Sequence, residues 1–364
     1  MSIIALNKWI PNLKKPLVVA GPCSAESEEQ MLTTARELVQ IEDVRIFRAG
    51  IWKPRTRPNN FEGHGEVALP WLKTVKEETG LLTATEVANA GHVELALKYG
   101  VDILWIGART TVNPFSVQEI ADALRGTNIP VMIKNPINVD LALWLGAIER
   151  LEAVGLKKLV AIHRGFSVAE KSRYRNEPMW KLPIELKRRL PEMPLICDPS
   201  HITGRRDMIL EVSQKALDID MDGLMIETHP NPDAAWSDAS QQVTPEMLNQ
   251  IIKSLSLRTE FSSDRNLEHE LEILRSRIDR FDNELIEVLA NRMKIVSEIG
   301  ELKKKGQITA FQVHRMDQML KAREDSALKL GLAKKYIDEV FNIIHDESVR
   351  HQTKILNSFN EDPK

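Results

Sequence analysis

The sequence predicts an α/β fold, a (β/α)8 TIM barrel, followed by an all-α helical domain, and three observations support this fold class. From residue 17 onward, short apolar runs rich in β-branched residues alternate with amphipathic stretches. The alternation occurs eight times over roughly 240 residues, as a parallel barrel requires. From residue 267 onward the alternation is replaced by a long stretch in which apolar residues recur at helical spacing. A doubly wound sheet is the competing fold, but no G-x-G-x-x-G motif follows the first apolar run.

The expected strands are the apolar runs themselves, each bounded by Gly, Pro or polar residues. Between them lie helix-like segments such as 27–40, 138–155 and 206–219, often closed by Gly or Pro. In chain order the expected strands cover 17–24, 44–50, 81–87, 103–109, 130–136, 159–166, 194–200 and 223–229.

The C-terminal part reads as helices. Residues 267–306 contain no Pro, and apolar residues such as Leu274, Phe281 and Leu289 recur at helical spacing. Two more helices fit around 312–329 and 333–358. We therefore expect a barrel over 1–254, a polar linker over 255–266 and a helical domain over 267–364. A helix this long would leave its apolar stripe in water, so we expect at least a homodimer.

Composition excludes several classes of protein. The net charge is −3 at pH 7, which gives no overall attraction to nucleic acid or to an anionic membrane. Two cysteines, Cys23 and Cys197, make no disulfide framework at this length, and Cys197 is expected in the core. No apolar run approaches a secretory signal or a membrane span, so a cytoplasmic protein is expected.

The C-terminal ends of the expected strands carry charged or reactive residues, and this is the face where barrels hold their active sites. Six of these residues are cations, and gathering them in one pocket costs free energy unless dianions bind there, because buried like charges repel. Guanidinium groups match phosphates and carboxylates, so two anionic substrates are expected. The six cations are Arg48, Lys53, Arg55, Arg109, Lys134 and Arg164.

A second set at the same rim offers sulfur, nitrogen and oxygen donors. Its members are Cys23, His201, Glu227 and Asp238, with Asp198 close to His201 in sequence. Taken singly, Cys23 is interpreted as a core thiol, His201 as a loop histidine, and Glu227 and Asp238 as solvated carboxylates. Together at one rim they suit a divalent metal such as Mn²⁺, Fe²⁺, Co²⁺ or Zn²⁺.

Seven segments then carry a family resemblance. They are "GPCSAES", "FRAGIWKPRTRP", "IGART", "IKNP", "HRGF", "DPSHITGRRD" and "IETHPNPDAAWSDASQQ". Residues 15–255 resemble the 3-deoxy-D-arabino-heptulosonate 7-phosphate (DAHP) synthases, and "KPRT" is the specific part. The related eight-carbon sugar acid synthases share the barrel but carry a different segment after the second strand.

The resemblance implies condensation of phosphoenolpyruvate with erythrose 4-phosphate, with release of phosphate. It implies that Arg48, Lys53, Arg109, Lys134 and Arg164 bind phosphoenolpyruvate and that Arg55 and Thr56 bind erythrose 4-phosphate. The metal on Cys23, His201, Glu227 and Asp238 would act as a Lewis acid. Lys134 is the expected proton donor, with Lys53 and Asp198 as further catalytic groups. A phosphosugar-binding sensor with a structural metal is the noncatalytic alternative.

The helical tail carries a second resemblance. The segments "LRSRIDRFDNELIEVLANRMKIVSEIGELK", "VHR" at 313–315 and "DESVRHQ" at 346–352 are similar to the all-helical chorismate mutases. This resemblance implies an isomerase that converts chorismate to prephenate. Arginines would clamp the two carboxylates, while Lys303 and Gln352 stabilise charge on the ether oxygen. The implied site residues are Arg275, Arg292, Lys303, Arg315, Ser348 and Gln352.

The tail departs from its family at two positions. Gln312 and Met316 stand where many members have acidic residues, which weakens the expected recognition of the substrate hydroxyl. The favoured hypothesis is a bifunctional enzyme, and prephenate is expected to inhibit the synthase through the tail. The alternative is a synthase whose tail serves only regulation and dimerisation.

Overall fold

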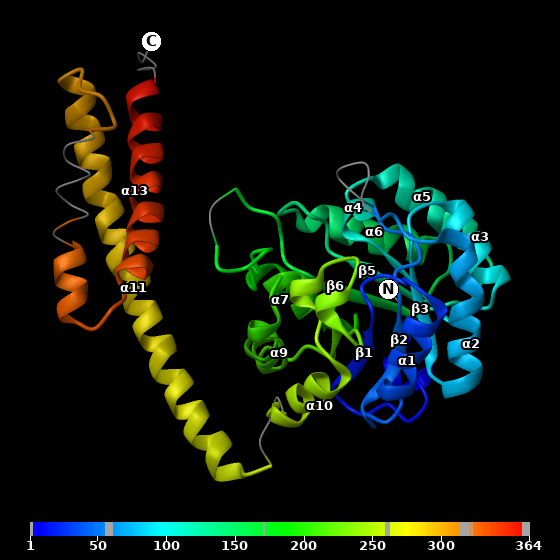
Figure 1. The fold of residues 1–364 in the computed structure, drawn as a ribbon. Helices are drawn as coiled ribbons and strands as arrows, with labels where there is room; N and C mark the ends of the chain where they lie inside the picture. Colours follow the sequence, from blue (N-terminus) through cyan, green and yellow to red (C-terminus); the bar gives the residue numbers. More distant parts are fainter. Residues whose placement is uncertain are drawn as a thin grey trace. The chain divides into compact units, whose positions relative to one another are not determined.

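The computed structural model describes residues 3–54, 61–169, 172–258, 263–312, 321 and 323–358. The chain divides into two compact units, Met1–Glu260 and Phe261–Lys364 (Figure 1). The boundary falls inside the expected linker, between the last helix of the first unit and the first helix of the second.

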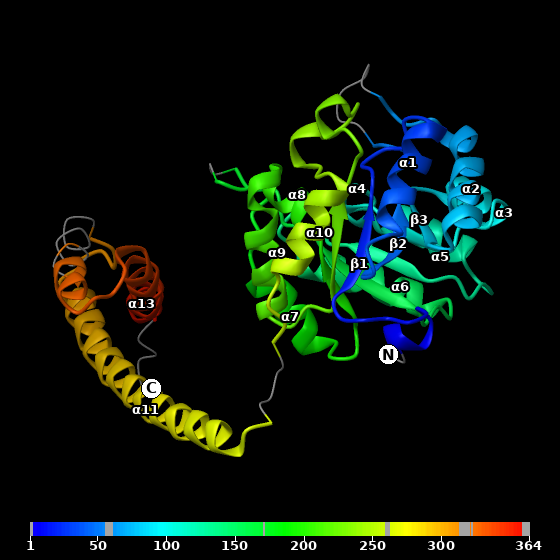
Figure 2. The same ribbon diagram turned by 60° about the horizontal axis from the view of Figure 1, so that its bottom comes forward.

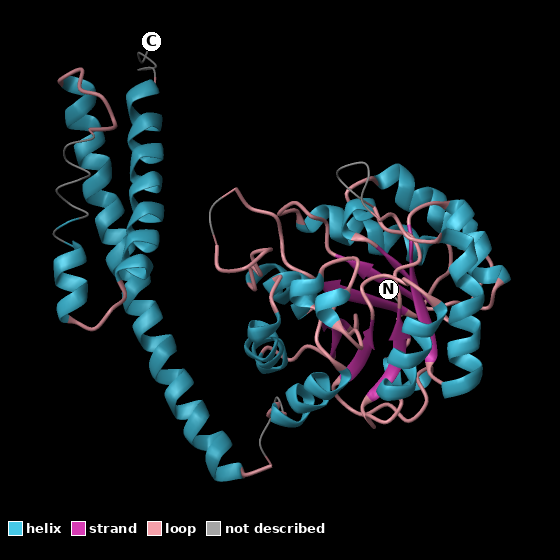
Figure 3. Ribbon diagram, in the orientation of Figure 1, coloured by secondary structure: helices cyan, strands magenta, loops and turns pink. Residues whose placement is uncertain are grey.

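The first unit is a closed barrel of eight parallel strands that neighbour one another in chain order (Figure 3). The predicted fold class is therefore confirmed, and each expected apolar run contributes one strand. The strands are β1 (Leu17–Gly21), β2 (Val44–Arg48), β3 (Leu82–Val87), β4 (Ile103–Ile106), β5 (Val131–Lys134), β6 (Leu159–His163), β7 (Leu195–Cys197) and β8 (Gly223–Glu227).

Helices surround this barrel on the outside (Figure 2). They are α1 (Glu28–Leu38), α2 (Leu69–Thr79), α3 (Ala90–Lys98), α5 (Pro114–Ala123), α6 (Leu141–Ala153), α7 (Lys181–Arg189), α9 (Ile209–Asp218) and α10 (Pro245–Ser254). The short helices α4 (Ala108–Thr111) and α8 (Pro199–Thr203) follow β4 and β7 directly, at the C-terminal ends of the strands. Short 3-10 helices cover Leu6–Lys8, Gly65–Ala68, Arg206–Met208, Pro232–Ala234 and Ala239–Gln241.

Local sequence explains where several of these helices begin. Ser27, Asn89 and Asp140 precede α1, α3 and α6, and each side chain accepts a hydrogen bond from a backbone N–H in the first turn. Asp198 caps α8 in the same way, through the N–H of His201. This cap fixes a charged residue at the end of β7, at the rim of the barrel.

The core has two layers because alternate residues of each strand face opposite sides. In β1, Val19 packs inside the barrel while Val18 packs against the helices. Trp105 is the largest side chain inside the barrel, and it is fully buried. Cys197 packs in the outer layer, as expected for a core thiol.

The second unit is built on two long helices that lie side by side, α11 (Arg265–Lys305) and α13 (Lys334–Asn357) (Figure 1). They run parallel, since Arg292 contacts Ser348 and Gly300 lies against Ile355. Residues 323–329 are also helical. A Cβ at Gly300 would lie 2.8 Å from Ile355 Cδ1, so glycine allows the close approach of the two helices.

The N-terminal half of α11 contains no buried residue. Leu274, Ile278, Phe281 and Leu285 all keep half or more of their surface exposed. Among the described residues, no helix combines the length and the apolar character needed to cross a membrane.

Candidate functional site

The C-terminal ends of the strands surround a polar cavity of about 750 Å³. Its walls come from six of the loops that follow the strands. The lining residues are Lys53, Pro54, Phe61, Glu86, Ala108, Arg109, Lys134, Ile137, Arg164, Ser167, Arg175, Asn176, His201, Trp236, Ser237 and Asp238.

The positions of the site residues follow from strand register. Arg48, Lys134 and Glu227 are the last residues of β2, β5 and β8. Arg164 and Asp198 come directly after β6 and β7. Because all strands are parallel, their C-terminal ends lie at one face of the barrel, and side chains far apart in sequence meet there.

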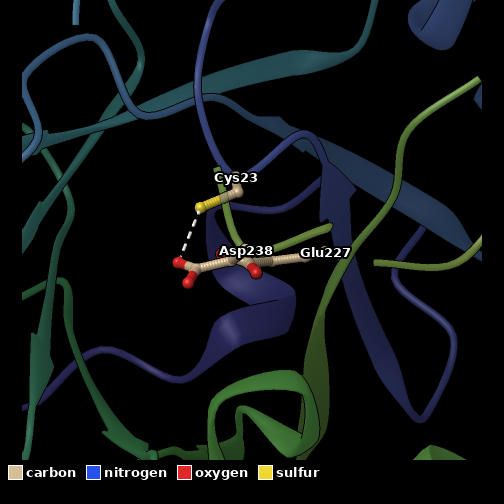
Figure 4. Close-up of side chains that lie close together, drawn as sticks. All are labelled: Cys23, Glu227 and Asp238. Carbon is tan, nitrogen blue, oxygen red and sulfur yellow. Dashed lines mark hydrogen bonds between the residues drawn. The ribbon is translucent and has the colours of Figure 1, made fainter. Parts of the chain in front are cut away.

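Three of the four expected metal ligands lie together. Donor atoms of Cys23, Glu227 and Asp238 all lie within 4.8 Å of one another (Figure 4). Cys23 Sγ lies 3.2 Å from Asp238 Oδ2. Glu227 Oε1 is buried and has no hydrogen-bond partner among the described residues. A thiol and two carboxylates, one of which has an oxygen that accepts no hydrogen bond from the described residues, are a donor set that fits a divalent cation.

His201 lies beside this cluster without joining it at that spacing. Its Nδ1 lies 2.9 Å from Asp198 Oδ2 and 3.8 Å from Glu227 Oε1. Burial lowers the pKa of His201, against the opposing effect of Asp198. A neutral imidazole oriented by a carboxylate is the form that ligates metals.

Lys53 contacts both the backbone and the thiol of Cys23. Its Nζ donates to the carbonyl oxygen of Cys23 at 2.8 Å and lies 3.0 Å from Cys23 Sγ. Burial, followed by the nearby Glu227 carboxylate, raises the pKa of Cys23 to about 12. Burial also disfavours the charged form of Lys53, but Cys23 and Glu227 outweigh it and raise the Lys53 pKa. The thiol is therefore protonated unless a cation replaces its proton.

Arg48 is buried behind the cavity and does not line it. Its Nη2 lies 3.3 Å from Glu227 Oε1, and its guanidinium lies 4.8 Å from the centre of the Trp105 ring. Burial opposes ionisation of Glu227, but His201 and Arg48 lower its pKa. Two other nitrogens of Arg48, Nε and Nη1, are buried without a partner among the described residues. The ion pair corrects the premise that only bound dianions can compensate these cations, because carboxylates of the chain do so in part.

Lys134 forms the second buried ion pair. Its Nζ lies 2.8 Å from Asp198 Oδ2, and Asp198 also contacts His201. Burial alone would raise the pKa of Asp198, but His201 and Lys134 hold it well below the usual range. The catalytic candidates Lys134 and Asp198 are thus in direct contact.

The remaining cations of the expected set lie on the cavity wall or outside the described residues. Arg109 and Arg164 line the cavity, and Arg164 Nη1 donates to Asn176 Oδ1 at 2.7 Å. Burial lowers the Arg164 pKa to about 10. Arg55 and Thr56, expected to bind erythrose 4-phosphate, lie outside the described residues.

Sequence reasoning missed Arg175, a further cation of the cavity wall. Arg175 lies well beyond the end of β6, in a segment with no apolar periodicity to place it. Its Nη1 donates to Asp238 Oδ1 at 2.9 Å and to Gln241 Oε1 at 2.6 Å. The signal that could have pointed to Arg175 is the basic composition of "KSRYRNEP", which indicates a charged loop.

In the helical unit, four expected residues lie near the contact between α11 and α13. Arg292 Nη1 donates to Ser348 Oγ at 2.5 Å, and Lys303 Nζ donates to the Ala310 carbonyl at 2.7 Å. Ser348 and Gln352 are buried one turn apart, and Gln352 Oε1 has no partner among the described residues. Burial lowers the pKa of both Arg292 and Lys303.

Arg275 does not join this group within one chain. It precedes Arg292 by 17 residues, about 25 Å along a helix axis. Its Nη1 lies 3.8 Å from Glu272 Oε2 on an exposed part of α11. Arg315 and Met316 lie outside the described residues.

Comparisons with known proteins match both units. Residues 9–261 match the family model of the DAHP synthetase I family, and residues 274–353 match that of chorismate mutase type II. A phospho-2-dehydro-3-deoxyheptonate aldolase of Thermotoga maritima is 31% identical over 238 residues, covering 65% of this chain and 68% of the relative.

Two further matches concern the barrel. A crystal structure of the Thermotoga maritima DAHP synthase aligns with a TM-score of 0.59 at 30% identity, covering 65% of this chain and 67% of that one. A 2-dehydro-3-deoxyphosphooctonate aldolase of Legionella pneumophila is 30% identical over 270 residues, covering 68% of this chain and 93% of the relative.

Proposed function

The chain belongs to the DAHP synthetase I family and carries a type II chorismate mutase domain, and from this pairing we infer how its two sites work. It is a bifunctional shikimate-pathway enzyme, a transferase and an isomerase of aromatic amino acid biosynthesis. The barrel condenses phosphoenolpyruvate with erythrose 4-phosphate to DAHP and phosphate, and the tail rearranges chorismate to prephenate.

We propose that the barrel cavity is the synthase site. One observation carries the proposal: Lys53, Arg109, Lys134 and Arg164 all line a cavity that also reaches Asp238 of the thiol and carboxylate cluster. Four cations match the phosphate and carboxylate of phosphoenolpyruvate, since guanidinium and ammonium groups bind such anions. Arg48 supports this site from behind by holding Glu227. Arg55 and Thr56 remain our proposal for the phosphate of erythrose 4-phosphate.

The proposed metal site comprises Cys23, Glu227 and Asp238, with His201 as the fourth ligand. The donor chemistry fits Mn²⁺, Fe²⁺, Co²⁺ or Zn²⁺. A divalent cation bound there would supply Lewis acidity for the aldehyde oxygen. The chain supplies the rest of the site: Asp198 orients the imidazole of His201, and Lys53 compensates the thiolate charge.

Lys134 is our proposed proton donor. The buried carboxylate of Asp198 contacts its Nζ and orients the ammonium at the end of β5. A charged lysine beside the cavity can hold the phosphoenolpyruvate carboxylate and give a proton to the oxygen that becomes an alcohol.

Phosphate release is the direct test of the synthase proposal. The full-length enzyme is stripped with a chelator, reloaded with Mn²⁺, and assayed with each substrate alone and with both together. Phosphate released only when both substrates and metal are present supports the proposal. Equal turnover after complete metal removal refutes the metal site, and binding without phosphate release supports the phosphosugar-binding sensor.

For the tail, we propose that Arg292, Lys303, Ser348 and Gln352 of one chain bind chorismate, with Arg315. Arg275 is too far along α11 to reach them, so the partner of a homodimer would supply it. The exposed apolar face of α11 supports that dimer, because Leu274, Ile278 and Phe281 would otherwise remain in water. Higher oligomers are compatible with this arrangement.

Prephenate is our proposed inhibitor of the synthase, acting from the tail. The wild-type enzyme should lose DAHP formation as prephenate is added, whereas Arg292→Ala should resist because its tail site is damaged. Identical responses of the two proteins would refute the proposal. The alternative is a tail that only regulates and dimerises, and no chorismate turnover by the full-length enzyme would support it. Gln312 and Met316, in place of acids, would weaken recognition of the chorismate hydroxyl.

We also propose a cytoplasmic location. Both cysteines are free thiols, and Cys23 must stay reduced to act as a ligand.

A further inference from the structure

Arg175 and Gln241 form a hydrogen-bonded bridge between two of the proposed metal ligands. Arg175 Nη1 donates to Asp238 Oδ1 at 2.9 Å and to Gln241 Oε1 at 2.6 Å. Gln241 Nε2 donates in turn to Glu227 Oε2 at 2.6 Å. The bridge therefore runs from one carboxylate to the other, through a guanidinium and an amide.

The direction of this bridge is fixed by chemistry. Arginine has only donors, so the oxygen of the Gln241 amide must face Arg175. The amide nitrogen then faces Glu227, whose Oε2 must accept. Gln241 is fully buried, so water cannot replace either bond without opening the structure.

The bridge uses one oxygen of each carboxylate and leaves the other for the metal. Asp238 Oδ2 lies 3.2 Å from Cys23 Sγ. Glu227 Oε1 is buried and without a hydrogen-bond partner among the described residues, beside Arg48 and His201. The two oxygens outside the bridge are those that face the thiol or the imidazole.

The backbone is shaped to accommodate the bridge. Gly204 has a φ of +66°, and a Cβ there would lie 2.6 Å from Arg175 Cβ, so a side chain would displace Arg175. Asp238 itself has a φ of 49°, which is unfavourable for a residue with a side chain. The Asp238 side chain that starts from this backbone is the one that accepts from Arg175.

We propose that Arg175 and Gln241 are positioning residues that hold Asp238 and Glu227 as single-oxygen ligands of the divalent cation. This inference rests on the proposed metal site. Hydrogen-bonded partners of this kind orient ligating carboxylates, and their loss typically costs ten- to a hundredfold in metal affinity. Arg175 acts through Asp238, and Gln241 acts through Glu227.

The test measures Mn²⁺ affinity of the full-length enzyme by electron paramagnetic resonance of free Mn²⁺, without substrates. Arg175→Met and Gln241→Leu should each weaken binding at least tenfold, and Arg175→Lys should recover part of the loss. Arg173→Met is the matched control, because Arg173 pairs with Glu211 on the surface and should leave affinity unchanged. Thermal unfolding establishes that each variant is folded.

The outcomes separate this inference from the site on which it rests. If the wild-type enzyme binds no Mn²⁺, both the metal site and the inference fail. If the wild type binds Mn²⁺ and both Arg175 variants bind within twofold of it, the inference alone fails. A loss in Arg175→Met that Arg175→Lys partly restores supports it, because a general structural defect would not depend on the charge at this position.

Discussion

Lys134 Nζ and Asp198 Oδ2 lie 2.8 Å apart, with both side chains almost completely buried at the C-terminal end of the barrel. Neither charge has much access to water, so each depends on the other. A pair of this kind is expensive to break from one side and much cheaper to remove as a whole.

Asp198→Asn should therefore lower stability by roughly 3 kcal/mol, because it leaves the Lys134 ammonium buried without its counterion. The double variant Lys134→Met with Asp198→Asn should regain most of that stability in chemical unfolding. Both proteins should lose synthase turnover by at least about a hundredfold, as expected when a proton donor is disabled. A double variant as unstable as the single one would contradict this account.

His163, the last residue of β6, makes stability depend on pH. Burial, followed by the nearby Arg164, lowers the pKa of His163 to about 3, from an ordinary value of 6.5. The unfolded chain therefore binds a proton between pH 6.5 and 3 that the folded chain does not. Stability from this group is complete above pH 6.5 and falls with pH in that window, by up to about 1.4 kcal/mol per unit.

The check is urea unfolding of the wild type and of His163→Phe at several pH values between 7 and 4.5. The wild type should lose about 1 kcal/mol more than the variant for each unit below pH 6. Comparing slopes removes the effect of the altered packing beside Trp180. Parallel slopes would mean that His163 takes up its proton in the folded protein over the same pH range as in the unfolded chain.

Arg292→Lys should separate the two activities. A lysine cannot reproduce a planar guanidinium clamp on a carboxylate, so chorismate turnover should fall by about a hundredfold or more. DAHP formation should stay within twofold of the wild type. Lys294→Gln is the matched control on the same helix, because its Nζ contacts only Asn291 among the described residues and lies on the exposed side.

Gly204→Ala should destabilise the barrel and weaken metal binding together. The left-handed backbone costs about 1 kcal/mol or more for alanine, and the new Cβ also meets Arg175. Gly126→Ala gives the backbone cost alone, since Gly126 has a φ of +81° and open space around its Cβ position. Thermal unfolding and Mn²⁺ titration of both variants should show a metal defect only in Gly204→Ala.

The proposed dimer predicts complementation between two inactive mutase variants. If Arg275 serves the site of its partner, a mixed dimer of Arg275→Ala and Arg292→Ala contains one intact site. Unfolding and refolding an equal mixture should restore about a quarter of wild-type chorismate turnover, from random pairing. No recovery, with mixed dimers demonstrated by mass spectrometry, would mean that both arginines belong to one chain's site.

The barrel could be predicted from sequence because the strands are apolar runs whose last residues are charged. Arg48, Lys134 and Glu227 stand at those ends, and parallel pairing brings them together wherever they occur in the chain. That pattern identified the rim, but it could not give the partner of each charge. Whether Lys134 faces Asp198 or the cavity depends on side-chain packing, which periodicity does not encode.

Arg175 and Gln241 illustrate the other limit of sequence reasoning. Both lie outside the strands and α-helices, Arg175 in the loop between the bridged residues Phe166 and Glu177 and Gln241 at the end of the 3-10 helix Ala239–Gln241. Neither segment has a hydrophobic periodicity that would predict which way its side chains point. A contact between them can therefore be seen only in the folded structure. His201 was expected as a ligand on the same footing as Cys23, and only the fold reveals its hydrogen bond to Asp198.

The bare apolar side of α11 has a consequence for how the enzyme behaves on dilution. If a second chain covers Leu274, Ile278 and Phe281, this half of α11 is stable only in the dimer. Its stability then depends on the protein concentration, because dilution dissociates the dimer. The barrel buries its core within one chain. Lowering the protein concentration should then abolish chorismate turnover at a concentration where DAHP formation is still measurable. The two activities of one polypeptide would therefore depend differently on protein concentration.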